Sequence, residues 1–83
     1  MDYFVYLIIT IINDKKISYV GYTNNLNERI KLHNSSKGAK FTRGKKWKLI
    51  YYKKFKNKSL AMKYEYFLKN NSKLRNIIKL NNL

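Results

Sequence analysis

Apolar and polar positions along this chain fall into blocks that predict three strands and three helices. Residues 3–12 form an almost unbroken apolar run, rich in tyrosine, phenylalanine, valine and isoleucine, which is typical of a buried strand. A turn signal at 13–16 separates it from a second strand-like run at 17–22, so the two runs predict an antiparallel hairpin. A third run, W-K-L-I-Y-Y-K-K-F, predicts a strand over 47–55.

Three further segments predict helices. Asn25 followed by Glu28 resembles a capping box and predicts a helix that ends near residue 34. Ser59 is expected to cap a second helix. Its core face is predicted to carry the apolar residues at helical spacing: Leu60, Ala61, Tyr64, Phe67 and Leu68. A break at 70–72 precedes a last helix from about residue 73.

The order β-β-α-β-α-α predicts an α+β fold, with a small three-stranded, mostly antiparallel sheet flanked by helices. A length of 83 residues predicts a single domain over 1–83. The chain has no cysteine, which excludes disulfides and thiolate metal sites. The apolar N-terminal run lacks a basic leader, carries Asp2 and is too short to span a membrane. We therefore expect no membrane association and a cytoplasmic location.

The net charge of +15, from 19 Lys and Arg against 4 Asp and Glu, favours a polyanionic partner. The alternative is compositional drift, because lysine, asparagine, isoleucine and tyrosine are all abundant in this chain. The sequence has no basic amphipathic helix with a Trp- or Phe-rich face, which is the feature expected of a protein that binds a membrane surface. Nucleic acid is the partner that this charge predicts.

Arg29 and His33 stand four residues apart on the first predicted helix and therefore share one face, bordering its apolar side. The chain has one histidine and three arginines, so an arginine here suggests a need for its planar, bidentate grip on phosphate. The structural alternatives are a surface cation at Arg29 and a polar residue tolerated near a helix C-terminus at His33.

Glu65 lies in the middle of the second predicted helix, at the border of its apolar face. The other three acidic residues have simple structural explanations at the terminus, in a turn or at a helix cap. A lone carboxylate at this position could bind Mg²⁺, which accepts few protein carboxylates together with water and substrate phosphate. An ion pair with Lys69 at i+4 is the alternative.

Tyrosines in the first two strands are a further candidate pair. Tyr6 and Tyr19 become cross-strand neighbours if the hairpin closes near Asp14, and two phenols near a cation could share a proton-transfer task. Packing of aromatic residues is the alternative. Gly21 lies near the end of the second strand, where a missing side chain allows a close approach to the backbone.

A basic loop between the first helix and the third strand carries five cations. Phe41 and Trp47 alternate with these cations, a mixture that suits phosphate contacts with occasional base stacking. A solvated loop flanked by two core aromatics is the alternative. The predicted nucleic-acid contacts are Lys37, Lys40, Arg43, Lys45 and Lys46.

These features together resemble the GIY-YIG nuclease superfamily. F-V-Y at 4–6 and Y-V-G at 19–21 match the two motif triplets in adjacent strands, followed by the arginine, histidine and glutamate in the family's order. H-N-S-S-K-G-A-K-F-T-R-G at 33–44 and S-L-A-M-K-Y-E-Y-F-L-K at 59–69 are similar to stretches of the small stand-alone bacterial members. Phe4 departs from the glycine of the family name, and Val20 replaces isoleucine.

The resemblance implies an endonuclease that hydrolyses DNA phosphodiester bonds with Mg²⁺, or another divalent cation such as Mn²⁺, in DNA repair, recombination or processing. Glu65 would hold the metal, and Arg29 would neutralise charge on the phosphoryl oxygens. Tyr6 or Tyr19 would take the proton of the attacking water, with His33 as the other candidate base. The alternative is a catalytically silent nucleic-acid-binding module, or a subunit that needs a protein partner to choose its substrate.

Overall fold

Strand β1 (Tyr3–Ile12) lies at the centre of a three-stranded antiparallel sheet with the order β2-β1-β3. The computed structural model describes residues 1–82. Strand β2 (Lys15–Thr23) and strand β3 (Lys48–Phe55) form the two edges of the sheet. The helices are α1 (Leu26–Asn34), a short 3-10 helix η1 (Lys40–Thr42), α2 (Lys58–Lys69) and α3 (Ser72–Asn81). The order β-β-α-β-α-α confirms the predicted α+β fold.

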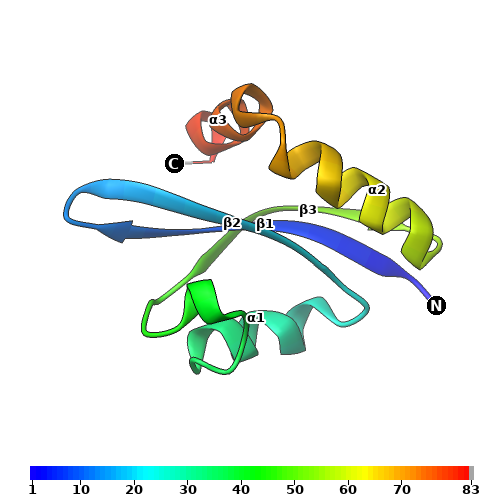
Figure 1. Ribbon diagram of the computed structural model, residues 1–83, viewed down its shortest axis with the longest axis horizontal. Helices are drawn as coiled ribbons and strands as arrows, with labels where there is room; N and C mark the ends of the chain where they lie inside the picture. The colour runs from blue at the N-terminus through cyan, green and yellow to red at the C-terminus, as the bar shows by residue number, and fades with distance from the viewer. Residues whose placement is uncertain (83) are drawn as a thin grey trace.

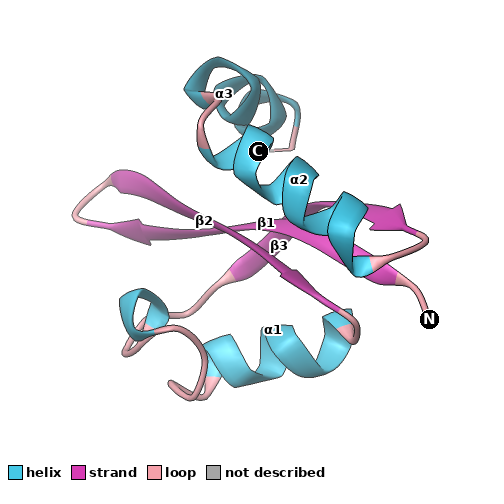
Figure 2. Cartoon of the chain, turned by 45° about the vertical axis from the view of Figure 1, so that its right-hand side comes forward, coloured by secondary structure: helices cyan, strands magenta, loops and turns pink. Residues whose placement is uncertain are grey.

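The sheet separates two helical layers (Figures 1 and 2): α1 and η1 cover one face, and α2 and α3 cover the other. Alternate residues of β1 therefore enter different cores. Val5 and Leu7 pack with Leu68 on the α2 and α3 side, whereas Tyr6 and Ile8 pack with residues on the α1 side. This double burial explains why β1 is apolar without alternation, since a strand covered on both faces needs no polar side.

Two details of the predicted helix α2 are wrong. Its N-cap is Asn57, whose side chain accepts a 2.9 Å hydrogen bond from the Leu60 amide, and Ser59 lies inside the first turn. Leu60 and Phe67 are 46% and 49% exposed, so the buried stripe of α2 is narrower than the spacing of apolar residues suggested. None of the helices within residues 1–82 has both the length and the apolar character needed to cross a bilayer.

Candidate active site

Tyr6 and Tyr19 face the α1 side of the sheet and lie diagonally across the β1–β2 pair. Tyr6 is directly opposite Gly21, and Tyr19 is opposite Ile8. The fully buried ring of Tyr6 lies on Gly21, where a Cβ atom would come within 2.6 Å of Cζ. The predicted close approach at Gly21 is therefore confirmed, and the group that approaches is the phenol of Tyr6.

Helix α1 brings His33 against both tyrosines. The helix starts at Asn25, whose Oδ1 accepts from the Glu28 amide at 3.2 Å, while the Asn25 amide donates to Thr23 Oγ1 instead of to a Glu28 side chain. His33 Nε2 lies 2.7 Å from the Tyr6 hydroxyl, in a fully buried contact. The imidazole also meets the Tyr19 ring edge-on, with the centroids 5.2 Å apart.

Thr42 fixes the proton position on His33. Its Oγ1 lies 2.8 Å from the Ala39 carbonyl oxygen, to which it donates its single hydrogen, and 2.8 Å from His33 Nδ1. Nδ1 must therefore be the donor to Thr42, and in a neutral imidazole Nε2 is then an acceptor. The Tyr6 hydroxyl donates to Nε2, so a directed chain of hydrogen bonds runs from Tyr6 through His33 to Thr42 and the backbone.

Gly38 allows the loop to close over the imidazole. A Cβ atom at this position would lie 2.5 Å from His33 Nδ1 and 3.1 Å from its Cα. Any side chain here would push the loop outwards and separate Thr42 from His33. The loop that was predicted to bind nucleic acid thus also orders the histidine.

Burial and the guanidinium of Arg29 determine the protonation states of Tyr6 and His33. Burial raises the pKa of Tyr6 to about 12, although Arg29 acts in the opposite direction. Burial, with the Arg29 charge as a second cause, lowers the pKa of His33 to about 4. At neutral pH the phenol is therefore protonated and the imidazole neutral, as the hydrogen-bond chain requires.

Arg29 and Glu65 approach the tyrosines from opposite layers. The partly buried Arg29 comes from α1, and its charge acts on both Tyr6 and His33. Glu65 comes from α2, its charge also acts on Tyr6, and its side chain is 19% exposed. Its only ionic partner among residues 1–82 is Lys69, at 3.8 Å, which is the structural alternative noted above.

The carboxylate of Glu65 suits one class of metal ion. The described part of the chain has no group of three or more His, Cys, Asp and Glu side chains that could enclose a metal. A single partly exposed carboxylate fits Mg²⁺ or Mn²⁺, because such ions take their remaining oxygens from water and substrate phosphate. The donor set would not suit zinc, which takes three or four protein ligands, mostly histidine nitrogen and cysteine sulfur.

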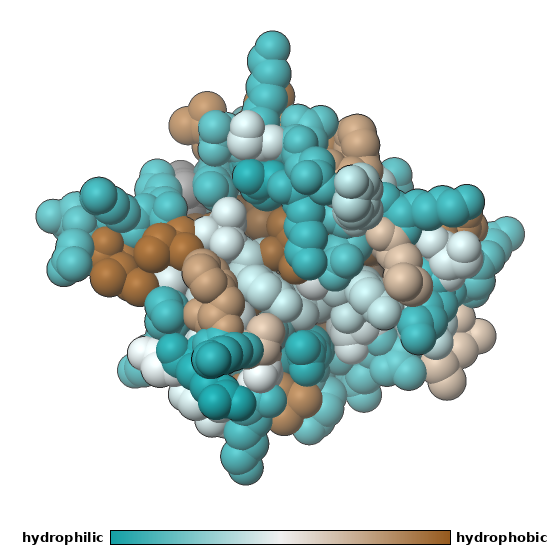
Figure 3. All heavy atoms as spheres, in the orientation of Figure 1, coloured by the Kyte–Doolittle hydropathy of each residue, from teal (hydrophilic) through white to brown (hydrophobic). Residues whose placement is uncertain are grey.

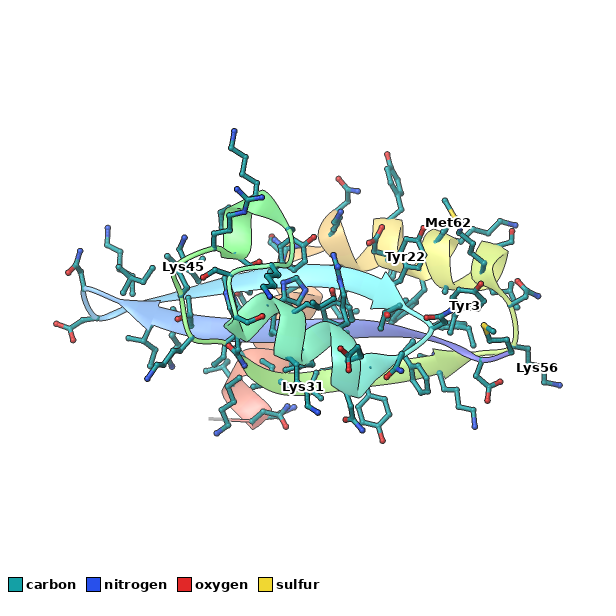
Figure 4. All side chains as sticks on the ribbon, turned by 90° about the horizontal axis from the view of Figure 1, so that it is seen from below. Tyr3, Tyr22, Lys31, Lys45, Lys56 and Met62 are labelled. Carbon is teal, nitrogen blue, oxygen red and sulfur yellow. The ribbon has the colours of Figure 1, made fainter. Side chains whose placement is uncertain are left out.

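The predicted basic loop lies along the β2 edge with most of its cations in solvent. Lys45, seen in Figure 4 at the opposite end of the molecule from Lys56, donates to the Phe41 carbonyl at 3.1 Å. Only two ion pairs, Lys54 with Asp2 and Lys69 with Glu65, occur within residues 1–82. The exposed cations of the loop are Lys37, Lys40, Arg43 and Lys46.

The two aromatic residues of this loop have different environments. Trp47 is a core residue, 5% exposed, whose Nε1 donates to the Thr42 carbonyl at 2.9 Å. Phe41 is 52% exposed. Trp47 is therefore a packing residue of the core, as the alternative interpretation of this loop expected. Phe41 keeps an exposed surface that could contact a ligand.

Known proteins resemble this chain over most of its length. The sequence matches the GIY-YIG catalytic domain family over residues 2–79. A UPF0213 protein of Oceanobacillus iheyensis is 47% identical over 70 residues, which cover 83% of this chain and 80% of that protein. An uncharacterized protein of Acanthamoeba polyphaga mimivirus is 43% identical in an alignment that covers 96% of this chain and 51% of that protein, so this chain spans about half its length.

A solved structure has a similar fold. The solution NMR structure of a UPF0213 protein from Bacillus halodurans matches with a TM-score of 0.52 and 35% identity. The match covers 99% of this chain and 87% of that one. The arrangement of strands and helices described above is thus shared with a sequence relative.

Proposed function

Because the chain belongs to the GIY-YIG catalytic domain family, we propose that it is a metal-dependent endonuclease that hydrolyses DNA phosphodiester bonds. The observation that carries this proposal is the buried chain of hydrogen bonds from Tyr6 through His33 to Thr42. A protein that only binds nucleic acid has no need for a phenol aimed at the free nitrogen of a buried, neutral imidazole.

Tyr6 and His33 act as a two-step proton acceptor in this proposal. The Tyr6 hydroxyl is buried in the free protein, so this proposal requires substrate binding to bring it into contact with the attacking water. The water then transfers a proton to the Tyr6 oxygen as the new bond to phosphorus forms, and the phenolic hydrogen moves to His33 Nε2. The bond between phosphorus and the 3′ oxygen breaks, which gives a 5′-phosphate and a 3′ oxygen that takes up a proton from solvent, and His33 then releases its added proton. Burial, and after it the Arg29 charge, hold the His33 pKa down. A bound phosphate beside Arg29 would offset the second of these causes, so substrate binding favours this transfer.

Arg29 and Glu65 supply the electrostatic stabilisation of the transition state in this proposal. Arg29 stabilises charge that grows on the phosphoryl oxygens, and it stands next to the phenol that activates the water. Glu65 would bind Mg²⁺ or Mn²⁺ together with the substrate phosphate, and the ion would polarise the scissile phosphate and stabilise the leaving oxygen. Tyr19 packs against His33 and keeps the imidazole shielded from water.

The basic loop suits the polyanionic substrate. Its exposed cations have no carboxylate partners within the described residues, and their charge would be neutralised by backbone phosphates. This feature alone would fit a binding module equally well. A protein partner that selects the substrate is compatible with the proposal, and repair, recombination or processing of DNA is the role that we propose.

A cleavage assay tests the proposal. Labelled single-stranded, duplex, flap and four-way-junction DNA are incubated with the protein in Mg²⁺ or in EDTA. We expect cutting in Mg²⁺ alone, and a loss of at least about a hundredfold in Glu65→Gln and Arg29→Ala. Glu28→Gln is the matched control, since this exposed carboxylate lies outside the site. Cutting by a folded Glu65→Gln protein would overturn the metal assignment, and tight binding without cutting would favour the binding module.

A further inference from the structure

A groove runs beside the candidate active site along the exposed edge of strand β2, between the two helical layers. Its volume is about 300 Å³, within the range of small-ligand sites. Figure 3 shows this face, where hydrophilic side chains of the upper and lower layers border a paler band. The groove is lined by Ser18, Tyr19, Val20, Phe41, Lys69 and Arg75.

The groove adjoins the reacting groups on both of its walls. Tyr19 belongs to the groove and also contacts His33. On the opposite wall Lys69 lies one helical turn after Glu65 on α2 and forms an ion pair with it. If the scissile phosphate of a strand is held at Arg29 and Glu65, the nucleotide next to it is the part of the strand that lies nearest to this groove.

Phe41 provides an aromatic surface in the groove. Its ring is stacked with Tyr19 at 20°, with the centroids 6.2 Å apart, and more than half of the side chain is exposed. The Lys45 ammonium lies 5.5 Å from the ring centroid. An exposed aromatic side chain beside a cation is the usual means of stacking a base while holding its backbone.

The cations of the other wall are held in place by α2 and α3. The Nη1 of Arg75 donates to the Leu68 carbonyl at 2.8 Å, and also to the Lys69 carbonyl, at the end of α2. The guanidinium is thereby anchored at the groove. Farther along, Lys16 and Lys79 line the next hollow, two residues before Ser18 on β2 and one turn after Arg75 on α3. Positive charge thus continues along the path that a strand would follow.

We propose that this groove binds one unpaired nucleotide next to the scissile phosphate, with its base on Phe41 and its phosphates at Lys69 and Arg75. The position of this nucleotide relative to the cleaved bond rests on the proposed nuclease function. A base inside a duplex is stacked on both faces, so it must leave the stack to reach Phe41. The site therefore selects DNA that has an unpaired or easily unpaired nucleotide at this place.

A binding experiment in EDTA tests the inference without any cleavage. Single-stranded oligonucleotides carry 2-aminopurine at successive positions, and its fluorescence reports stacking. We expect quenching at one position with the wild-type protein, loss of that quenching in Phe41→Ala, and affinity lower by roughly 5- to 150-fold. Phe41→Trp should restore both. Tyr52→Ala is the matched control, because Tyr52 is equally exposed, at 55%, and lies on the opposite edge strand β3.

The phosphate contact is tested by salt dependence. Lys69→Gln should reduce the slope of log affinity against log salt by about 0.7. Lys58→Gln, in the exposed first turn of the same helix, should leave the slope unchanged. Unchanged quenching and affinity in Phe41→Ala would overturn the inference, even if the protein cuts DNA. Phe41-dependent quenching in a protein that never cuts would uphold the binding site and reject the nuclease.

Discussion

The hydroxyl of Tyr6 and the Nε2 of His33 are joined by a buried 2.7 Å hydrogen bond, although the residues are 27 positions apart in the chain. The central strand supplies the phenol and the first helix supplies the imidazole. Each ring has a second contact: the hydroxyl end of Tyr6 packs on Gly21, and the other nitrogen of His33 bonds to Thr42. The pair is therefore a fixed proton donor and acceptor, and its protonation can be probed directly.

Stability should fall as the pH is lowered from 7 to 4. Folding lowers the pKa of His33 from 6.5 to about 4, so between these values the unfolded chain binds a proton that the folded protein excludes. The free energy of unfolding should decrease by up to about 3 kcal/mol across this window and gain nothing further above pH 6.5. Urea denaturation at a series of pH values measures this change.

His33→Gln provides the control for that experiment, because it removes the one histidine of the chain and leaves every other ionisable group in place. The variant should be less stable at pH 7 and should lose most of the slope between pH 6.5 and 5. An equally steep slope with and without the histidine would show that His33 is not the group responsible.

Thr42→Val should release the histidine from its fixed tautomer. The substitution keeps the shape of the side chain but leaves the Nδ1 hydrogen buried without an acceptor, at a cost of about 1–3 kcal/mol in stability. Thr42 is a positioning residue, so cleavage should fall about 10- to 100-fold as the proton moves to Nε2 and the acceptor for Tyr6 disappears.

Nitrogen chemical shifts of the single histidine separate this effect from a general loss of stability. The wild-type protein should show a neutral ring protonated at Nδ1, and Thr42→Ser should keep that pattern and most of the activity. If Thr42→Val shows the same tautomer as the wild type, the threonine does not set the proton position.

The sequence predicts the strands and helices well because their patterns are local. The apolar run of β1, the turn at Asn13 and the cap at Asn25 each depend on neighbouring residues, and all three are found in the structure. The position of Arg29 and His33 on one face of α1 follows from helical spacing in the same way. The match to the GIY-YIG motifs then places the two tyrosines and Glu65 in order along known elements.

The contacts that order the site could not be predicted, since they depend on how a loop folds back. Thr42 and Gly38 stand within a loop that was noted for its cations, its aromatic residues and its likeness to bacterial family members, and none of these features indicates that the two residues close over His33. The groove at Phe41 needs α3 to bring Arg75 beside β2, and the pattern of a helix does not indicate against which strand it packs. The available signal for Thr42 was its place in the stretch 33–44, which resembles the small bacterial members of the family.

The two candidate caps of α2 can be distinguished by stability. Asn57→Ala removes the acceptor for the Leu60 amide and should lower the free energy of unfolding by about 1 kcal/mol. Ser59→Ala removes no such contact and should change it by less than about 0.5 kcal/mol. Urea denaturation of both variants measures the difference, and the reverse order would restore Ser59 as the cap.

Gly21→Ala should destabilise the protein because the phenol of Tyr6 occupies the space of the new methyl group. The added Cβ would lie 2.6 Å from Cζ and would also overlap the hydroxyl oxygen, so the ring must move, at a cost of about 1–3 kcal/mol. In a Tyr6→Leu background both the hydroxyl and Cζ are absent, and the same substitution should cost clearly less. A double-mutant cycle of unfolding free energies measures this coupling. Equal costs in the two backgrounds would mean that Gly21 is required for its backbone and not for the position of Tyr6.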